Sequence, residues 1–306
     1  MSEQKSSLSR FAPLFIILAS SLWGVDGIVL RPALFTLPVP LVVFIESSIV
    51  AILLTPFFIK RYSELKKLTY LDWLAFLGVA LSGGAIGVMA ITKALFYVNY
   101  VNLSVVVLIQ KLQPVFAIFL AAVFLKERLP KTFFIWAGMA LAGAYLMTFG
   151  LSLPQWTQGD KTTAAALLSL LAAFSFGSST VLSKRALKHV EFKLGTYLRF
   201  LISSGVMLII VLSAGDISQI SDVSNKQMLI FLLIAFSTGG PAIFLYYYGL
   251  RRITASVATI CELAFPLTAV LLEYLLRGNM LGPVQWLGVF ILFAGIIKVS
   301  RLQNAA

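Results

Sequence analysis

The sequence predicts an all-α integral membrane protein of about ten transmembrane helices, arranged as two inverted five-helix repeats around a central cavity. Composition is the first of three observations behind this prediction. Hydrophobic residues make up 59% of the 306 residues and charged residues only 12%, about half the charged share of a soluble domain. The distribution of basic residues and an internal repeat are the other two.

Ten apolar runs are separated by mostly short polar connections. They lie at about 11–31, 38–59, 71–94, 101–124, 132–150, 163–184, 194–213, 227–249, 253–276 and 283–300. Each is close to the roughly 20 residues that span a bilayer as a helix. The runs do not alternate every second residue, so helices are favoured over a β-barrel. No small-residue cleavage site follows the polar N-terminus, and we expect the first run to be a retained helix.

Lys and Arg are distributed unevenly among the connections. With the N-terminus in the cytoplasm, 17 of the 24 basic residues fall in inside connections and 4, Arg31 among them, in outside ones. Cytoplasmic connections of membrane proteins are enriched in Lys and Arg. We therefore expect a multi-pass protein of the inner (plasma) membrane with both termini cytoplasmic. This topology explains the net charge of +12, so no nucleic-acid partner is expected.

Shifting the sequence by 152 or 153 residues aligns its two halves, and Pro114 then matches Pro266. We expect a first repeat at 1–155 and a second at 156–306. Five spans in each half are an odd number, so the second half enters the membrane from the opposite side. Inverted repeats are typical of secondary transporters, whose halves rock around a site near the midplane. A duplicated membrane protein that transports nothing is the alternative.

Several short motifs suggest a family. The stretch 113–116 (QPVF), followed by 124–129 (FLKERL), and the stretch 19–24 (ASSLWG) in the first run resemble the EamA repeat of the drug/metabolite transporter superfamily. The resemblance implies ten helices, a central cavity and export or exchange of metabolites, often amino acids. It also implies an arginine early in the second helix of each repeat. Arg199 fits this pattern, whereas the equivalent position of the first half holds an acid, Glu46.

Ionisable residues within the apolar runs mark the candidate site, because a charge at a helix centre costs at least about 2.5–3.5 kcal/mol on insertion scales. Lys111 and Glu262 lie near the middle of two spans that the repeat relates. Lys111 could bind a carboxylate and Glu262 an ammonium group or a coupling proton, or the two could form a structural ion pair between the halves. The candidate substrate-binding residues are Lys111, Glu262, Trp23, Gln110, Glu46, Arg199, Asp26, Tyr97 and Lys93.

Pro114 and Pro266 lie close after these charges and are the candidate hinges. A proline within a helix frees the backbone carbonyl one turn earlier, here at Gln110 and Glu262. Polar side chains would then coincide with unpaired backbone at the midplane, which is where a transporter binds a polar solute.

Aromatic residues form a second set of candidates. Tyr97 lies near a helix end, where tyrosines more often belong to the membrane–water interface than to a ligand site. Trp23 lies about one turn before Asp26 and is the aromatic residue that we most expect to contact a substrate.

These features predict a secondary transporter, most simply an exporter, that moves amino acids or related zwitterions by alternating access. The alternative is a carrier of the same fold for a nucleoside-like cofactor, a cationic drug or a lipid. A membrane-embedded enzyme is disfavoured because Cys261 and His189 are the only residues of their types and cannot assemble a catalytic pair or a metal cluster. We accordingly expect no catalytic residue, no metal and no cofactor. The expected partners are a small-molecule solute and the bilayer, with a proton as the candidate coupling ion.

Overall fold

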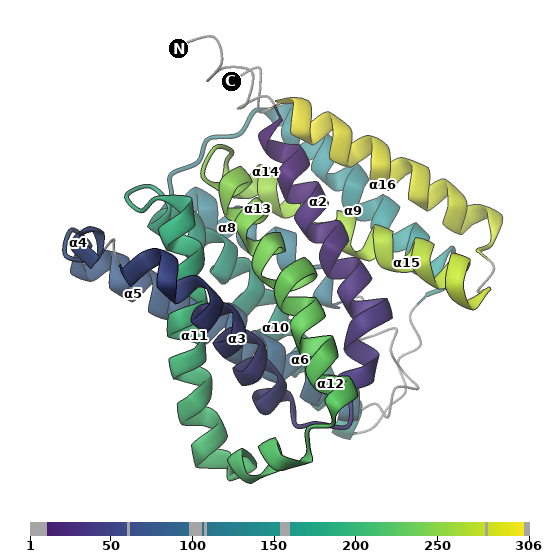
Figure 1. The fold of residues 1–306 in the computed structure, drawn as a ribbon. Coiled ribbons are helices and arrows are strands. Elements are labelled where there is room, and N and C mark those ends of the chain that lie inside the picture. Colours follow the sequence, from purple (N-terminus) through teal and green to yellow (C-terminus); the bar gives the residue numbers. More distant parts are fainter. Residues whose placement is uncertain are drawn as a thin grey trace.

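The computed structural model describes residues 11–59, 62–97, 106, 109–153, 160–278 and 281–302. In these residues all regular elements are helices, gathered into one bundle (Figure 1). The first half contains α2 (Ala12–Val25), the π-helix η1 (Asp26–Leu30), the 3₁₀ helix η2 (Arg31–Leu34), α3 (Val39–Ile59), α4 (Tyr62–Leu65), α5 (Tyr70–Val79), the π-helix η3 (Ala80–Ile86), α6 (Gly87–Tyr97), α8 (Gln113–Phe124) and α9 (Lys131–Phe149).

The second half follows the same order of long and interrupted helices. It contains α10 (Asp160–Ala186), α11 (Phe192–Ala214), the 3₁₀ helix η4 (Asp216–Asp222), α12 (Asn225–Ile234), the π-helix η5 (Ala235–Gly239), α13 (Gly240–Leu250), α14 (Ala255–Cys261), α15 (Ala264–Arg277) and α16 (Pro283–Leu302).

Within the described residues, nine helical segments are long and apolar enough to cross a bilayer, and α8 is a shorter apolar helix. Part of the remaining expected span, at about 101–124, lies outside the described residues. Large apolar side chains cover the outside of the bundle, and Phe57, Phe119 and Phe290 are 73%, 63% and 65% exposed. Lipid suits such a surface and water does not. The chain is therefore a multi-pass membrane protein, and the predicted all-helical fold class is confirmed.

Helices of one half pack against helices of the other half in equivalent pairs. α2 packs against α13 and α15, and its repeat-related partner α10 packs against α6 and α8. α3 pairs with α11, and α9 pairs with α16. The α9–α16 crossing is so close that a side chain at Gly143 would run into the backbone of Leu292. Each half thus places its first helix within the other, as two repeats related by a two-fold axis would.

Interruptions occur at equivalent places in the two halves. The π-helix η3 separates α5 from α6, and η5 separates α12 from α13. A turn at Lys111 and Leu112 precedes α8, and a turn at Glu262 and Leu263 separates α14 from α15. A π-segment carries one residue more than an α-helical turn and is frequent at functional sites. These interruptions bring non-helical backbone to the level of the membrane where the sequence predicts a site.

The candidate hinge prolines start helices rather than bend them. Pro114 is the second residue of α8 and Pro266 the third residue of α15. The expectation of a free carbonyl at Glu262 is wrong, because that carbonyl accepts a hydrogen bond from the amide of Phe265 at 2.9 Å. A tight turn between α14 and α15 supplies this donor. The hinge role of both prolines stays a prediction.

Candidate functional site

The carboxylate of Glu262 lies where four interrupted or crossing helices meet. It is half-buried in the turn between α14 and α15. Gln113, at the start of α8, donates to Oε2 from Nε2 at 2.9 Å. The Tyr246 hydroxyl of α13 donates to Oε1 at 2.6 Å, and the Thr180 hydroxyl of α10 donates to the same oxygen at 3.2 Å. Both halves of the chain therefore supply hydrogen-bond donors to one carboxylate, which a buried charge requires.

An aromatic wall stands beside this carboxylate. The ring of Trp23 lies 5.3 Å from that of Tyr246, with an angle of 51° between the ring planes. Tyr246 is 3% exposed, and its hydroxyl also lies 3.2 Å from that of Thr180. Because α2 packs against α13, Trp23 reaches the centre from the first half of the chain. We call Trp23, Gln113, Thr180, Tyr246 and Glu262 the Glu262 centre.

Lys111 does not face Glu262, and the two form no ion pair in the described structure. Instead, Lys111 lines an open hollow with Leu112, Val115, Leu141 and Tyr145. Gln113, and not Lys111, lies within hydrogen-bond distance of the Glu262 carboxylate. The structural ion pair between Lys111 and Glu262, which the sequence left open as an alternative, is therefore not formed in this structure.

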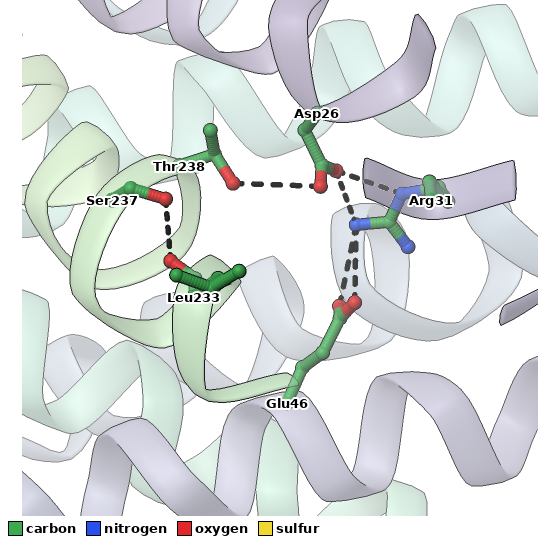
Figure 2. Close-up of polar contacts among 6 residues, drawn as sticks. All are labelled: Asp26, Arg31, Glu46, Leu233, Ser237 and Thr238. Atoms are coloured by element: carbon green, nitrogen blue, oxygen red, sulfur yellow. Dashed lines mark hydrogen bonds and ion pairs between the residues drawn. The ribbon is translucent and has the colours of Figure 1, made fainter. Parts of the chain in front are cut away.

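A second polar cluster lies near the end of the first span (Figure 2). Arg31 forms an ion pair with Asp26, from Nη2 to Oδ2 at 2.6 Å, and a second with Glu46, from Nη2 to Oε1 at 3.3 Å. The Thr238 hydroxyl of η5 donates to the other oxygen of Asp26, Oδ1, at 3.4 Å. We call Asp26, Arg31, Glu46 and Thr238 the Arg31 cluster. Asp26 and Glu46 were candidates, whereas Arg31 was assigned to a connection and Thr238 was missed.

Among the described residues, the other candidates form no hydrogen bond with either group. Arg199 donates to the Tyr247 hydroxyl at 3.4 Å, with its guanidinium 5.7 Å from the centre of that ring. Lys93 is exposed, and its ammonium lies 5.8 Å above the ring of Tyr97. The Oε1 atom of Gln110 is buried without a hydrogen-bond partner. Their roles in binding stay predictions.

Sequence signals existed for some of the missed residues. Gln113 belongs to the stretch 113–116 that carries the family resemblance, and it lies one turn after Gln110. Tyr246 is one of three consecutive tyrosines, of which only one can face a given neighbour. No pattern marked Thr180, because it is one of several hydroxyl side chains in this stretch of α10, and such side chains in a helix often bond to their own backbone.

The sequence profile of the EamA-like transporter family matches residues 10–149 and again residues 163–301. The chain is 47% identical over 291 residues to a Fusobacterium nucleatum protein named riboflavin transporter ImpX, covering 95% of this chain and 97% of that one. It is 32% identical over 185 residues to an uncharacterized Bacillus subtilis transporter, YwfM, covering 60% of each chain. Protein PecM of Dickeya dadantii is 25% identical over 223 residues and 72% of each chain.

A solved crystal structure shares the fold. Its chain superposes with a TM-score of 0.75 at 15% identity, covering 96% of this chain and 98% of that one. Identity this low supports the fold alone. The two profile matches and the near full-length relative together show that this chain belongs to the EamA-like transporter family and is a membrane transporter rather than an enzyme.

Proposed function

We propose that this protein carries riboflavin, or a solute with the same kind of fused heterocycle, across the membrane through the Glu262 centre. One observation carries the proposal, the 47% identity over 95% of the chain to a protein named riboflavin transporter. The comparisons thus favour the nucleoside-like cofactor over the amino acid. The geometry also argues against a zwitterion, because Lys111, the expected partner for its carboxylate, does not face Glu262.

The chemistry of the Glu262 centre suits a flavin ring. The pyrimidine edge of riboflavin carries an N–H between two carbonyl groups. Glu262 can accept from that N–H, while the Gln113 amide and the Tyr246 or Thr180 hydroxyl can donate to the flanking carbonyls. The rings of Trp23 and Tyr246 offer faces against which a flat heterocycle can stack. A few converging polar groups beside aromatic side chains are typical of small-molecule sites.

Uptake of radiolabelled riboflavin into proteoliposomes tests the proposal, with protein-free vesicles as the reference. We expect saturable uptake that excess unlabelled riboflavin abolishes and a mixture of amino acids does not. Riboflavin methylated at the imide nitrogen should compete poorly, because it lacks the proton that Glu262 accepts. Uptake no faster than in protein-free vesicles would reject the proposal.

A variant of the aromatic wall tests the site separately from the cargo. Trp23→Ala should weaken riboflavin transport by roughly tenfold, because this is the change in affinity expected when one aromatic ring that stacks on a heterocycle is lost. Trp73→Ala is the matched control, because Trp73 lies on α5, is 39% exposed and is not part of the Glu262 centre. Equal losses in the two variants would show that Trp23 contributes only to folding.

Coupling and topology complete the proposal. We propose alternating access driven by a proton gradient through Glu262, in the plasma membrane and with both termini cytoplasmic. Figure 1 places the start of α2 and the end of α16 at the same end of the bundle, which supports an even number of crossings. Glu262→Gln should abolish the response of flavin transport to an imposed pH gradient. An unchanged response would remove Glu262 from the coupling.

A further inference from the structure

The two halves of the chain meet at the end of the bundle that holds the Arg31 cluster. Asp26 of the first half contacts Thr238 of the second. Gln227, near the start of α12, donates from Nε2 to the Thr36 hydroxyl at 2.9 Å and to the carbonyl of Ala33 at 3.4 Å. A buried apolar group seals the same region with Leu34, Leu37, Leu41, Val42, Ile45, Val211, Phe231 and Ile234. This end is therefore closed by contacts that join the halves.

Arg31 and Glu46 link two helices that belong to different packing groups. Arg31 begins η2, directly after α2 and η1, and α2 packs on α13 and α15 of the second half. Glu46 lies on α3, which packs mainly on α11 and to a smaller extent on α12 and η5. The Arg31–Glu46 ion pair therefore crosses the boundary between a group that contains α2 and a group that contains α3. Any motion that separates the two groups at this end must break that ion pair.

The charges of the cluster make it a two-state element. The side chain of Arg31 is 34% exposed, while those of Asp26 and Glu46 are 8% and 15% exposed. While the end is closed, each carboxylate needs the guanidinium, because an unpaired charge in an apolar environment is costly. Once the end opens, water solvates Glu46, and Arg31 can keep Asp26 as its partner. Both arrangements leave every charge satisfied, and the π-helices η1 and η5 that carry Asp26 and Thr238 are irregular segments able to adjust.

We propose that the Arg31 cluster is the gate that closes this end of the transport path. In the closed state, Arg31 joins η2 to α3, and Asp26 joins η1 to η5. The gate opens when Glu46 leaves Arg31 and Asp26 leaves Thr238. The path to the Glu262 centre, which begins about one turn away at Trp23, is then open to water at this end.

Side-specific labelling of a thiol tests the gate without any knowledge of the cargo. Cys261 is the only cysteine and is fully buried, so Cys261→Ala gives a background free of native thiols. Thr180→Cys in that background places a thiol at the Glu262 centre. A membrane-impermeant maleimide is then applied separately to each face of the membrane. Asp222→Cys, at an exposed position of η4 beside the start of α12, identifies the face on which the Arg31 cluster lies.

Glu46→Gln should raise the labelling rate of the reporter from that face by roughly fivefold or more, and lower it from the other face. This variant keeps the Arg31–Asp26 pair, so no charge is left alone. Asp222→Asn is the matched control, with the same loss of charge near the same end and outside the cluster, and it should change neither rate.

Three results would overturn the gate. They are an unchanged rate from the Arg31 face, an equal rise from both faces, and a rise of the same size in Asp222→Asn. If Glu46→Gln fails to insert, Thr238→Val removes the contact between the halves without changing a charge and is judged by the same criteria. The labelling rates do not depend on transport, so failure of the riboflavin proposal would leave this test intact.

Discussion

The two ends of the bundle are held by different contacts, although the repeat relates them. A shift of 153 residues places Lys184 where Arg31 stands and Arg199 where Glu46 stands. The first pair is a base and an acid, whereas the second is two bases and cannot form an ion pair. Lys184 donates instead to the carbonyls of Leu250 and Arg251, at 2.9 and 3.1 Å. One scaffold thus supports an ion pair at one end and hydrogen bonds from a lysine to backbone carbonyls at the other.

Glu127 supplies the acid at the second end, from the turn between α8 and α9. Its carboxylate accepts hydrogen bonds from the amides of Ala255 and Ser256, at 2.7 and 3.1 Å, at the start of α14. A carboxylate at a helix N-terminus satisfies amides that have no partner within the helix. Lys126 adopts a left-handed φ of 56°, and Gly278, its equivalent by a shift of 152, has a φ of 68°. A positive φ therefore occurs at equivalent positions of the two halves, and in the first half the residue that follows it, Glu127, reaches across to the second half.

Removal of Arg31 should produce the largest effect on stability, because it abolishes the ion pairs that distinguish this end of the bundle from the other. Arg31→Gln leaves Asp26 and Glu46 without a cation in an apolar environment, at a cost of about 3–5 kcal/mol. We expect a large fall in the thermal unfolding midpoint in detergent. Adding Glu46→Gln should recover part of the loss, because it removes one of the two uncompensated charges. A double variant no more stable than Arg31→Gln would show that Arg31 stabilises the fold by other contacts.

The crossing of α9 and α16 involves neither the Arg31 cluster nor Glu127. A variant at this crossing should therefore change the stability of the fold without changing the opening of the transport path. Gly143→Ala forces a methyl group against the backbone of Leu292 and should cost about 1–3 kcal/mol. Gly138→Ala on the same helix is the control, since nothing lies within 4 Å of the added carbon. We expect a lower unfolding midpoint for the first variant alone, with the ratio of thiol labelling from the two faces unchanged. A change in that ratio would show that the α9–α16 crossing also moves when the transport path opens.

Glu127→Gln tests the second end. One amide at the start of α14 would lose its acceptor and the charge at the helix terminus would vanish, at a cost of about 1–2 kcal/mol. Labelling of Thr180→Cys should rise from the face opposite to the one that Glu46→Gln opens. The same face responding to both variants would contradict the assignment of one closure to each end.

Thr238→Val should have the smallest effect, because the hydrogen bond that it removes is long and Asp26 keeps Arg31. We expect a loss of less than about 1 kcal/mol in stability. The labelling rate from the Arg31 face should rise less than in Glu46→Gln. A rise larger than that of Glu46→Gln would make the contact between the halves, rather than the ion pair, the dominant restraint.

Much of the fold could be predicted from the sequence, because every helix that crosses the lipid must be a long run of apolar residues. The apolar runs located the helices, and the family resemblance was confirmed by the profile matches. Which helices pack together could not be predicted, since the exchange of α2 and α10 between the halves depends on surface shape rather than on periodicity. Boundaries were also uncertain by a few residues, and for that reason Arg31 was placed in a connection instead of in η2.

The binding roles of the candidate residues stay predictions, and the structure shows only which of them lie together. Trp23 packs against Tyr246, whose hydroxyl donates to Glu262, while Gln113 rather than Lys111 bonds to that carboxylate. A sequence gives the depth of a residue from its position along a span. It gives the direction of the side chain only where the helix is regular, and the turn before α8 is not.

The π-helix η5 has a consequence for the length of the chain. Its extra residue shifts the angular phase of everything that follows, because one residue corresponds to about 100° of rotation in an α-helix. Deleting a single residue there would leave a regular helix of nearly the same length. Tyr246 would then be rotated away from Glu262, although its sequence neighbours would be unchanged. Between Gln227 of α12 and Tyr246 of α13, the spacing of the chain is therefore as strictly constrained as the identity of either side chain.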